Sequence, residues 1–160
     1  MPQITERREL PFRPADMFAF VADIERYSEF LKWCDGVVVH ARESEGDRKI
    51  VTAEMNVRVK MFTERFLTRV TLDAGSRTIE VDYIEGPFKR LVNRWTFEGP
   101  EGGPCIVGFW IDFEFRKPAL RLFAGVVLHE AVDRLVSAFV RRAYRLYDPT
   151  TNVAAPAEAS

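Results

Sequence analysis

Residues 51–73 read VTAEMNVRVKMFTERFLTRVTLD and carry the clearest structural signal in the chain. Apolar and polar residues alternate across positions 51–61, which is the two-residue period of a strand with one buried face. A second run follows at once, in which Phe66, Thr68 and Val70 share one face. The pattern predicts two consecutive strands of an antiparallel sheet.

Similar runs lie on both sides of this segment. Turn signals such as Asp73-Ala74-Gly75-Ser76 separate them. The remaining strand candidates are residues 3–10, 37–41, 79–83, 91–98 and 107–115. Together these runs predict a sheet of about six or seven strands.

Helical patterns occupy two other parts of the chain. Two short helices are expected after the first strand, one beginning at Pro14 and one over residues 25–31. A long helix is expected from Pro118 to about Tyr147, with apolar residues at spacings of three and four. At 1.5 Å per residue this helix would be about 45 Å long.

The order of these elements predicts an α+β fold of the helix-grip type. Helices and strands are segregated along the chain, which favours an antiparallel sheet. One helix can cover so large a sheet only if the twisted sheet curls around it. The curl leaves a lumen that is either filled by bulky side chains or open as an apolar pocket. The large inward residues compatible with either outcome are Phe66, Tyr83, Trp95, Phe97, Phe109 and Phe113.

Length and composition fit one domain, residues 1–148, followed by a disordered tail at 149–160. The 23 Lys and Arg residues nearly balance the 24 Asp and Glu residues. This balance gives no electrostatic case for nucleic acid, so DNA is not an expected partner. The N-terminus does not read as a secretory signal, and no run of about 18 apolar residues is present. We expect a cytoplasmic protein, with peripheral contact at the inner face of the membrane as an alternative.

No catalytic or metal-binding constellation is found in the sequence. His40 and His129 are the only histidines and are not spaced as metal ligands. Cys34 has no base placed near it and is expected to be a small buried thiol. Glu64 has inward parity and would then lie at a strand end or make a polar contact in the pocket, but a register offset that leaves it exposed is the favoured alternative. We therefore expect no enzyme activity, no resident cofactor and no metal.

Three blocks of sequence, in order, resemble a known family. They are Tyr27-Ser28-Glu29-Phe30-Leu31-Lys32-Trp33-Cys34, then Glu85-Gly86-Pro87-Phe88-Lys89-Arg90-Leu91 with Trp95-Thr96-Phe97, then Phe113-Glu114-Phe115 with Pro118-Ala119-Leu120 and residues 136–143. Over roughly residues 3–147 the chain resembles the coenzyme Q-binding protein family, part of the START-like, polyketide-cyclase-like (helix-grip) superfamily. Lys32 departs from the family pattern, which usually has Pro beside the Trp.

The resemblance implies non-catalytic binding of ubiquinone or a similar isoprenoid lipid between sheet and long helix, in support of respiratory electron transport. Related proteins suggest two alternatives, a ribosome-associated toxin that blocks subunit association and a polyketide aromatase or cyclase. Glu64, Asp82 and Tyr83 are the only acid–base candidates for the latter. Ten residues are expected to contact the ligand: Phe30, Trp33, Val57, Phe66, Tyr83, Phe88, Trp95, Phe113, Phe123 and Val127.

Overall fold

The computed structural model of the protein describes residues 3–59, 62–117 and 126–148. Its elements in chain order are β1 (Gln3–Leu10), α1 (Pro14–Ala22), the 3-10 helix η1 (Ile24–Glu29), β2 (Cys34–Glu45), β3 (Arg48–Val59), β4 (Phe62–Asp73), β5 (Thr78–Glu85), β6 (Phe88–Glu98), β7 (Cys105–Phe115) and α3 (Val126–Leu146).

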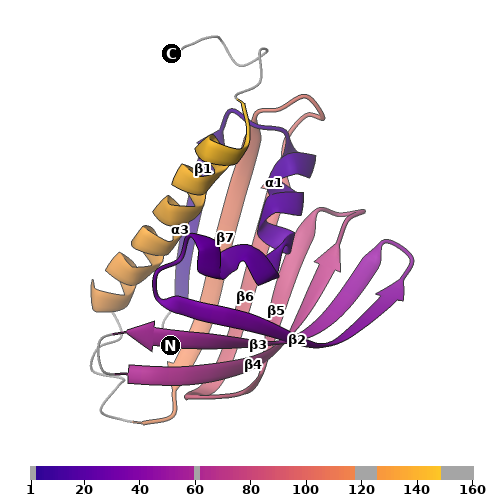
Figure 1. Cartoon of the computed structure of the whole chain (residues 1–160). Coiled ribbons are helices and arrows are strands. Elements are labelled where there is room, and N and C mark those ends of the chain that lie inside the picture. Colours follow the sequence, from indigo (N-terminus) through magenta and orange to yellow (C-terminus); the bar gives the residue numbers. More distant parts are fainter. Residues whose placement is uncertain (1–2, 60–61, 118–125, 149–160) are drawn as a thin grey trace.

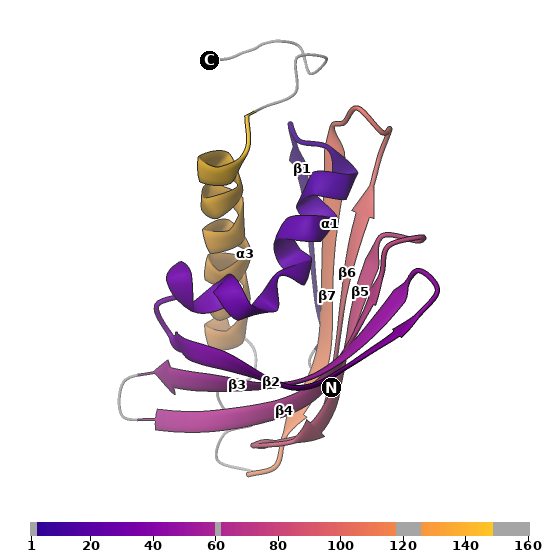
Figure 2. The same cartoon turned by 45° about the vertical axis from the view of Figure 1, so that its right-hand side comes forward.

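The seven strands form one antiparallel sheet in the order β1-β7-β6-β5-β4-β3-β2. The sheet curves so that β2, β3 and β4 turn beneath α3 and η1, whereas β6 and β7 run along α3 (Figures 1 and 2). Helices α1 and α3 lie on the concave side of the sheet (Figure 2). The expected helix-grip architecture is therefore confirmed.

Local irregularities in the strands assist this curvature. The register shifts twice between β2 and β3, once between β4 and β5 and once between β6 and β7. An extra residue in one strand of a pair bends that strand and increases its twist. The sheet can therefore close around the helices instead of lying flat.

The first helix packs its apolar side into the concave face. Pro14 occupies the first turn, where its missing N–H costs no hydrogen bond, and Met17, Phe20 and Val21 are buried. The next segment was predicted as a second short helix over residues 25–31. It is instead the six-residue 3-10 helix η1, in which only Ile24 and Tyr27 are buried.

Some predicted boundaries differ from those observed. Strand β6 begins at Phe88 rather than at position 91, because the break at Gly86-Pro87 is only two residues long. Strand β2 extends over twelve residues and is longer than its apolar core suggested. The predicted start of the long helix at Pro118 and the predicted tail at 149–160 lie outside the described residues.

Candidate ligand-binding cavity

A cavity of about 170 Å³ lies between the concave face of the sheet, η1 and α3. Most of its wall comes from alternate residues of β3 to β7, which the two-residue period of the strands directs to the same side. The wall is almost entirely apolar. Its lining residues are Ile24, Tyr27, Leu31, Trp33, Val37, Ala53, Met55, Phe66, Thr68, Val70, Ile79, Val81, Tyr83, Phe88, Leu91, Asn93, Trp95, Phe109, Ile111, Leu135 and Phe139.

Two clusters of aromatic rings contribute to the cavity wall. In the first, Phe88 contacts Phe66, Tyr83 and Phe113 with ring centroids 5.4–5.9 Å apart. In the second, the Phe139 ring of α3 lies 5.0 Å from that of Trp95 and 5.2 Å from that of Tyr27. Mutual packing fixes these rings, so the space that remains has a defined shape.

The turn between β5 and β6 folds over the Tyr83 ring. Gly86 has a φ of +150°, and a Cβ at this position would lie 2.9 Å from the Arg65 carbonyl oxygen and 3.0 Å from the Tyr83 hydroxyl. Only glycine allows so close an approach in this conformation. The turn then brings the Phe88 N–H to donate a hydrogen bond of 3.0 Å to the Tyr83 hydroxyl oxygen. The phenol proton of Tyr83 is left for a second bond.

Asn93 is a buried amide in the otherwise apolar wall, 7% exposed. Its Nδ2 donates a hydrogen bond of 2.8 Å to the carbonyl oxygen of Trp110 on the neighbouring strand. An amide nitrogen carries two protons, so one N–H remains after this bond. Buried donors normally have partners, because an unpaired one costs free energy.

The other hydroxyl groups of the wall use their protons within the protein. Tyr27 donates to the Val21 carbonyl oxygen, and burial raises the pKa of its phenol. Thr68 donates to the Ala53 carbonyl oxygen at 3.3 Å. Among these four polar side chains, Tyr83 and Asn93 therefore supply the free donor hydrogens. Such a wall suits an apolar molecule that carries hydrogen-bond acceptors.

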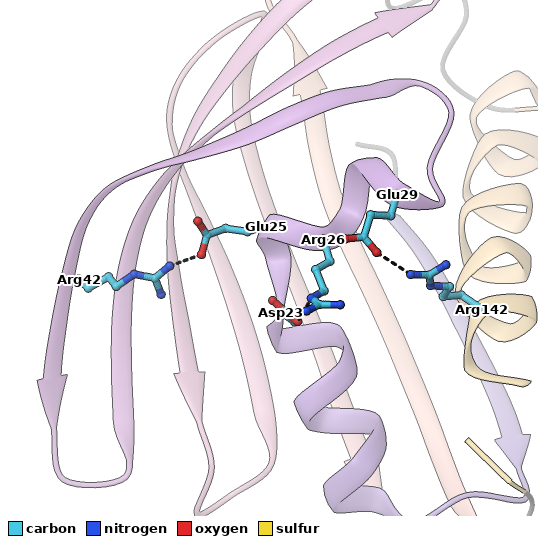
Figure 3. Close-up of polar contacts among 6 residues, drawn as sticks. All are labelled: Asp23, Glu25, Arg26, Glu29, Arg42 and Arg142. Carbon is cyan, nitrogen blue, oxygen red and sulfur yellow. Dashed lines mark hydrogen bonds and ion pairs between the residues drawn. The ribbon is translucent and has the colours of Figure 1, made fainter. Parts of the chain in front are cut away.

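Helix η1 is held over the cavity by ion pairs on both sides (Figure 3). Glu25 pairs with Arg42 of β2, and Glu29 pairs with Arg142 of α3 at 2.7 Å. Asp23 pairs with Arg26 at 3.1 Å within the same segment. These contacts tie a short element with few buried residues to the two elements beside it.

The structure places the ten predicted ligand contacts unevenly. Trp33, Phe66, Tyr83, Phe88 and Trp95 line the cavity. Phe113 lies behind Phe88, with ring centroids 5.9 Å apart, and is not part of the lining.

Of the other four predicted contacts, two lie outside the lining and two lie outside the described residues. Val57 is half-buried near the end of β3, where it pairs with Cys34. Phe30 ends η1, packs against Phe139 and faces a different hollow. Phe123 and the side chain of Val127 lie outside the described residues.

Apart from Tyr83, the residues considered for chemistry lie outside the cavity lining. His40 is exposed and its Nε2 lies 3.2 Å from a Glu54 carboxylate oxygen. His129, Glu64 and Asp82 are exposed. Burial raises the pKa of the Cys34 thiol. The described residues contain no cluster of three or more His, Cys, Asp or Glu side chains that could hold a metal ion.

Sequence reasoning missed several lining residues. Asn93 has the same strand parity as Trp95, so its inward position was accessible from the two-residue period. Tyr27, Leu135 and Phe139 come from helical elements, whose packing angle a strand pattern does not give. Of the residues that were missed, Asn93 is therefore the one that the strand pattern could have identified.

Comparison with known proteins places the chain in a family. A model of the family described as polyketide cyclase / dehydrase and lipid transport matches residues 10–140. The chain therefore belongs to this family. The predicted START-like, polyketide-cyclase-like superfamily is confirmed, whereas the narrower assignment to coenzyme Q-binding proteins is taken up below as a proposal.

Individual relatives carry different names. The ribosome association toxin RatA of Escherichia coli is 31% identical over 147 residues, which cover 92% of this chain and 90% of the relative. The mitochondrial coenzyme Q-binding protein COQ10 homolog B of Xenopus laevis is 27% identical over 91% of this chain and 59% of its own length. The solution structure of an 18 kDa protein from Caulobacter crescentus is 34% identical, with a TM-score of 0.76 over 91% of this chain and 98% of that one.

No helix in the described ranges combines the length and the apolar character needed to cross a membrane.

Proposed function

We propose that the protein binds, without catalysing a reaction, an apolar ring-bearing molecule with carbonyl oxygens, and that this ligand is ubiquinone or a similar isoprenoid quinone. The observation that carries the proposal is the apolar cavity between sheet and α3, with the donor hydrogens of Tyr83 and Asn93 in its wall. A quinone ring offers an apolar face and two acceptor oxygens, which match this wall. A role in respiratory electron transport would follow from that ligand.

The size of the cavity sets which part of a quinone it would hold. A cavity of about 150 Å³ in another protein holds benzene, and the volume here is about 170 Å³. This space fits one ring but not an isoprenoid chain as well. We infer that the ring would lie in the cavity and that the tail would leave it.

The absence of catalysis is proposed on the chemistry of the wall. None of the described lining residues is an Asp, Glu, His, Lys or Arg. A cyclase-type reaction needs groups that move protons at the substrate, usually with shifted pKa values. Asp82 and Glu64, the carboxylates considered for such a role, are exposed and outside the lining, so Tyr83 is the one of the three acid–base candidates that lines the cavity. A single phenol has no partner among the described lining residues to return the proton.

A titration with a quinone bearing a single isoprenoid unit tests the binding proposal. Quenching of tryptophan fluorescence reports on Trp95 and Trp33, both of which line the cavity. Val81→Phe fills the cavity and is expected to weaken binding at least tenfold. Val38→Phe is the matched control, because Val38 is 47% exposed and does not line the cavity. Equal affinities for the two variants would exclude this cavity as the site.

Ribosome association is the second candidate function. It is favoured by the match to the Escherichia coli toxin at 31% identity over 90% of that protein. It predicts that the purified protein co-sediments with separated ribosomal subunits, and that Val81→Phe leaves this co-sedimentation unchanged. Loss of co-sedimentation in that variant would connect the two activities.

A further inference from the structure

A second hollow lies on the outer side of η1, between this helix and the C-terminal half of α3. Its volume is about 400 Å³. Four cationic side chains and one carboxylate lie among its lining residues, which include Glu29, Lys32, Arg141, Arg142 and Arg145. We call this hollow the basic groove.

The single carboxylate of the basic groove is already neutralised. Glu29 accepts a hydrogen bond of 2.7 Å from Arg142, as Figure 3 shows, and the Arg142 guanidinium also lies 5.4 Å from the centre of the Phe30 ring. Lys32, Arg141 and Arg145 are exposed and form no ion pair with a carboxylate of the described residues. Three positive charges are therefore available to an anionic partner.

The basic groove and the apolar cavity share a wall. Leu31 and Trp33 line the cavity, whereas Lys32 between them lines the groove. On α3, Phe139 lines the cavity and Ala138 lines the groove. An anion bound in the groove would lie next to the place where an apolar ligand is held.

Exposed apolar side chains flank the basic groove on α3. Tyr144 is 51% exposed and Leu146 is 48% exposed, although both are large and apolar. They precede and follow Arg145 in the last turns of the helix. Neither lines the groove itself: one edge of the Tyr144 ring packs on Phe12, with centroids 4.9 Å apart, and Leu146 borders a neighbouring hollow. Basic residues with apolar neighbours are typical of a helical surface that lies on an anionic membrane.

We propose that the basic groove docks the protein on an anionic phospholipid surface, with Lys32, Arg141 and Arg145 binding lipid phosphates and Tyr144 and Leu146 entering the interface. This inference rests on the proposed function, because a lipid-dissolved ligand must pass between a bilayer and the cavity. RNA also offers phosphates. The flanking apolar residues and the shared wall favour the lipid.

Co-sedimentation with vesicles tests the proposal. The probes are vesicles of phosphatidylcholine containing phosphatidylglycerol, and vesicles of phosphatidylcholine alone. The wild type is expected to bind only the former, with an affinity that falls as salt is added. The triple variant Lys32→Gln, Arg141→Gln, Arg145→Gln removes three positive charges. Each such charge contributes about fivefold to the affinity for an anionic membrane, so the affinity should fall roughly a hundredfold.

A second triple variant controls for net charge. Arg7→Gln, Arg48→Gln and Arg69→Gln remove the same number of charges from exposed positions on three strands, and should lower the affinity less than tenfold. Equal losses of vesicle affinity in the two triple variants would overturn the proposal. Equal binding of the wild type to vesicles with and without phosphatidylglycerol would overturn it too. A groove variant that keeps its vesicle affinity but loses binding to ribosomal RNA would assign the groove to RNA instead.

The vesicles contain no quinone, so the docking result is independent of the cavity titration. In detergent, quinone should still quench the tryptophan fluorescence of the groove triple variant, with the affinity of the wild type. Loss of vesicle binding together with normal quenching is the result we expect. Normal vesicle binding together with absent quenching in the wild type would reject the proposed function and leave the docking surface standing.

Discussion

Tyr83 and Tyr27 both line the cavity, but their hydroxyl groups differ in how they bond. Tyr83 accepts a hydrogen bond from the Phe88 N–H and keeps its proton, whereas Tyr27 donates its proton to the Val21 carbonyl oxygen. Of these two tyrosines, only Tyr83 can therefore donate a hydrogen bond to a ligand without breaking an existing bond. Two side chains of the same type thus have different expected roles.

Tyr83→Phe and Tyr27→Phe form a matched pair of variants. Each removes a bond inside the protein and should lower the free energy of unfolding by about 1 kcal/mol. Tyr83→Phe should in addition weaken quinone binding about three- to tenfold, which is the usual worth of one hydrogen bond. Chemical denaturation and the quenching titration measure the two quantities. Equal quinone affinities in the two variants would contradict the assignment of the donor.

The buried thiols predict a loss of stability at alkaline pH. Burial raises the pKa of the Cys105 thiol from 9.0 to about 12 and also raises that of Cys34. The folded state therefore holds these protons at pH values where the unfolded chain has released them. Their contribution to stability is complete below about pH 9 and is lost as the pH rises toward 12.

Denaturation between pH 8 and 11 measures this loss. The free energy of unfolding should fall across that range in the wild type, and the slope should be smaller in Cys105→Ala. Cys34 and Tyr27 also have raised pKa values, so some slope should remain. A variant with the slope of the wild type would show that Cys105 does not hold its proton as described.

At the scale of elements, Gly108 of β7 pairs with Thr96 of β6. A Cβ added at Gly108 would lie 2.4 Å from the Thr96 hydroxyl oxygen. Gly108→Ala should therefore destabilise the protein by about 1–3 kcal/mol through overpacking. The second substitution Thr96→Ala removes the obstructing atom and should recover most of this loss, as thermal unfolding would measure.

Gly99 provides the contrasting case. It has a φ of +140°, and a Cβ there would lie 2.2 Å from the backbone carbonyl oxygen of Pro104. No side-chain substitution can remove a backbone atom, so Gly99→Ala should stay destabilised in any background. Failure of Thr96→Ala to rescue Gly108→Ala would mean that the two strands separate at this point instead of clashing.

The strand period predicted which residues of each strand face inward. Phe66, Tyr83 and Trp95 line the cavity as their parity required. Parity does not say where along a strand the cavity ends, so Val57 and Phe113 have inward parity but lie beyond the lining. The helical contributions of Phe139 and Tyr27 depend on how α3 and η1 dock, which no local pattern encodes.

At the scale of the whole molecule, the curvature of the sheet explains why a cavity exists at all. β2, β3 and β4 turn beneath α3 (Figure 2). This curvature leaves room for the cavity of about 170 Å³ between the concave face of the sheet and the helices. The order of elements predicted this curl and the two possible contents of the lumen. The choice between a filled lumen and an open one depends on how the large side chains, among them thirteen Phe, pack against one another, which no local pattern encodes.

Analysis of the lipid that co-purifies with the protein tests the central proposal most directly. The protein would be purified from a quinone-producing host, extracted with organic solvent and analysed by mass spectrometry, with Val81→Phe and Val38→Phe prepared in parallel. We predict near-stoichiometric ubiquinone in the wild type and in Val38→Phe, and little in Val81→Phe. Quinone absent from the wild type, or present equally in all three proteins, would contradict binding in this cavity.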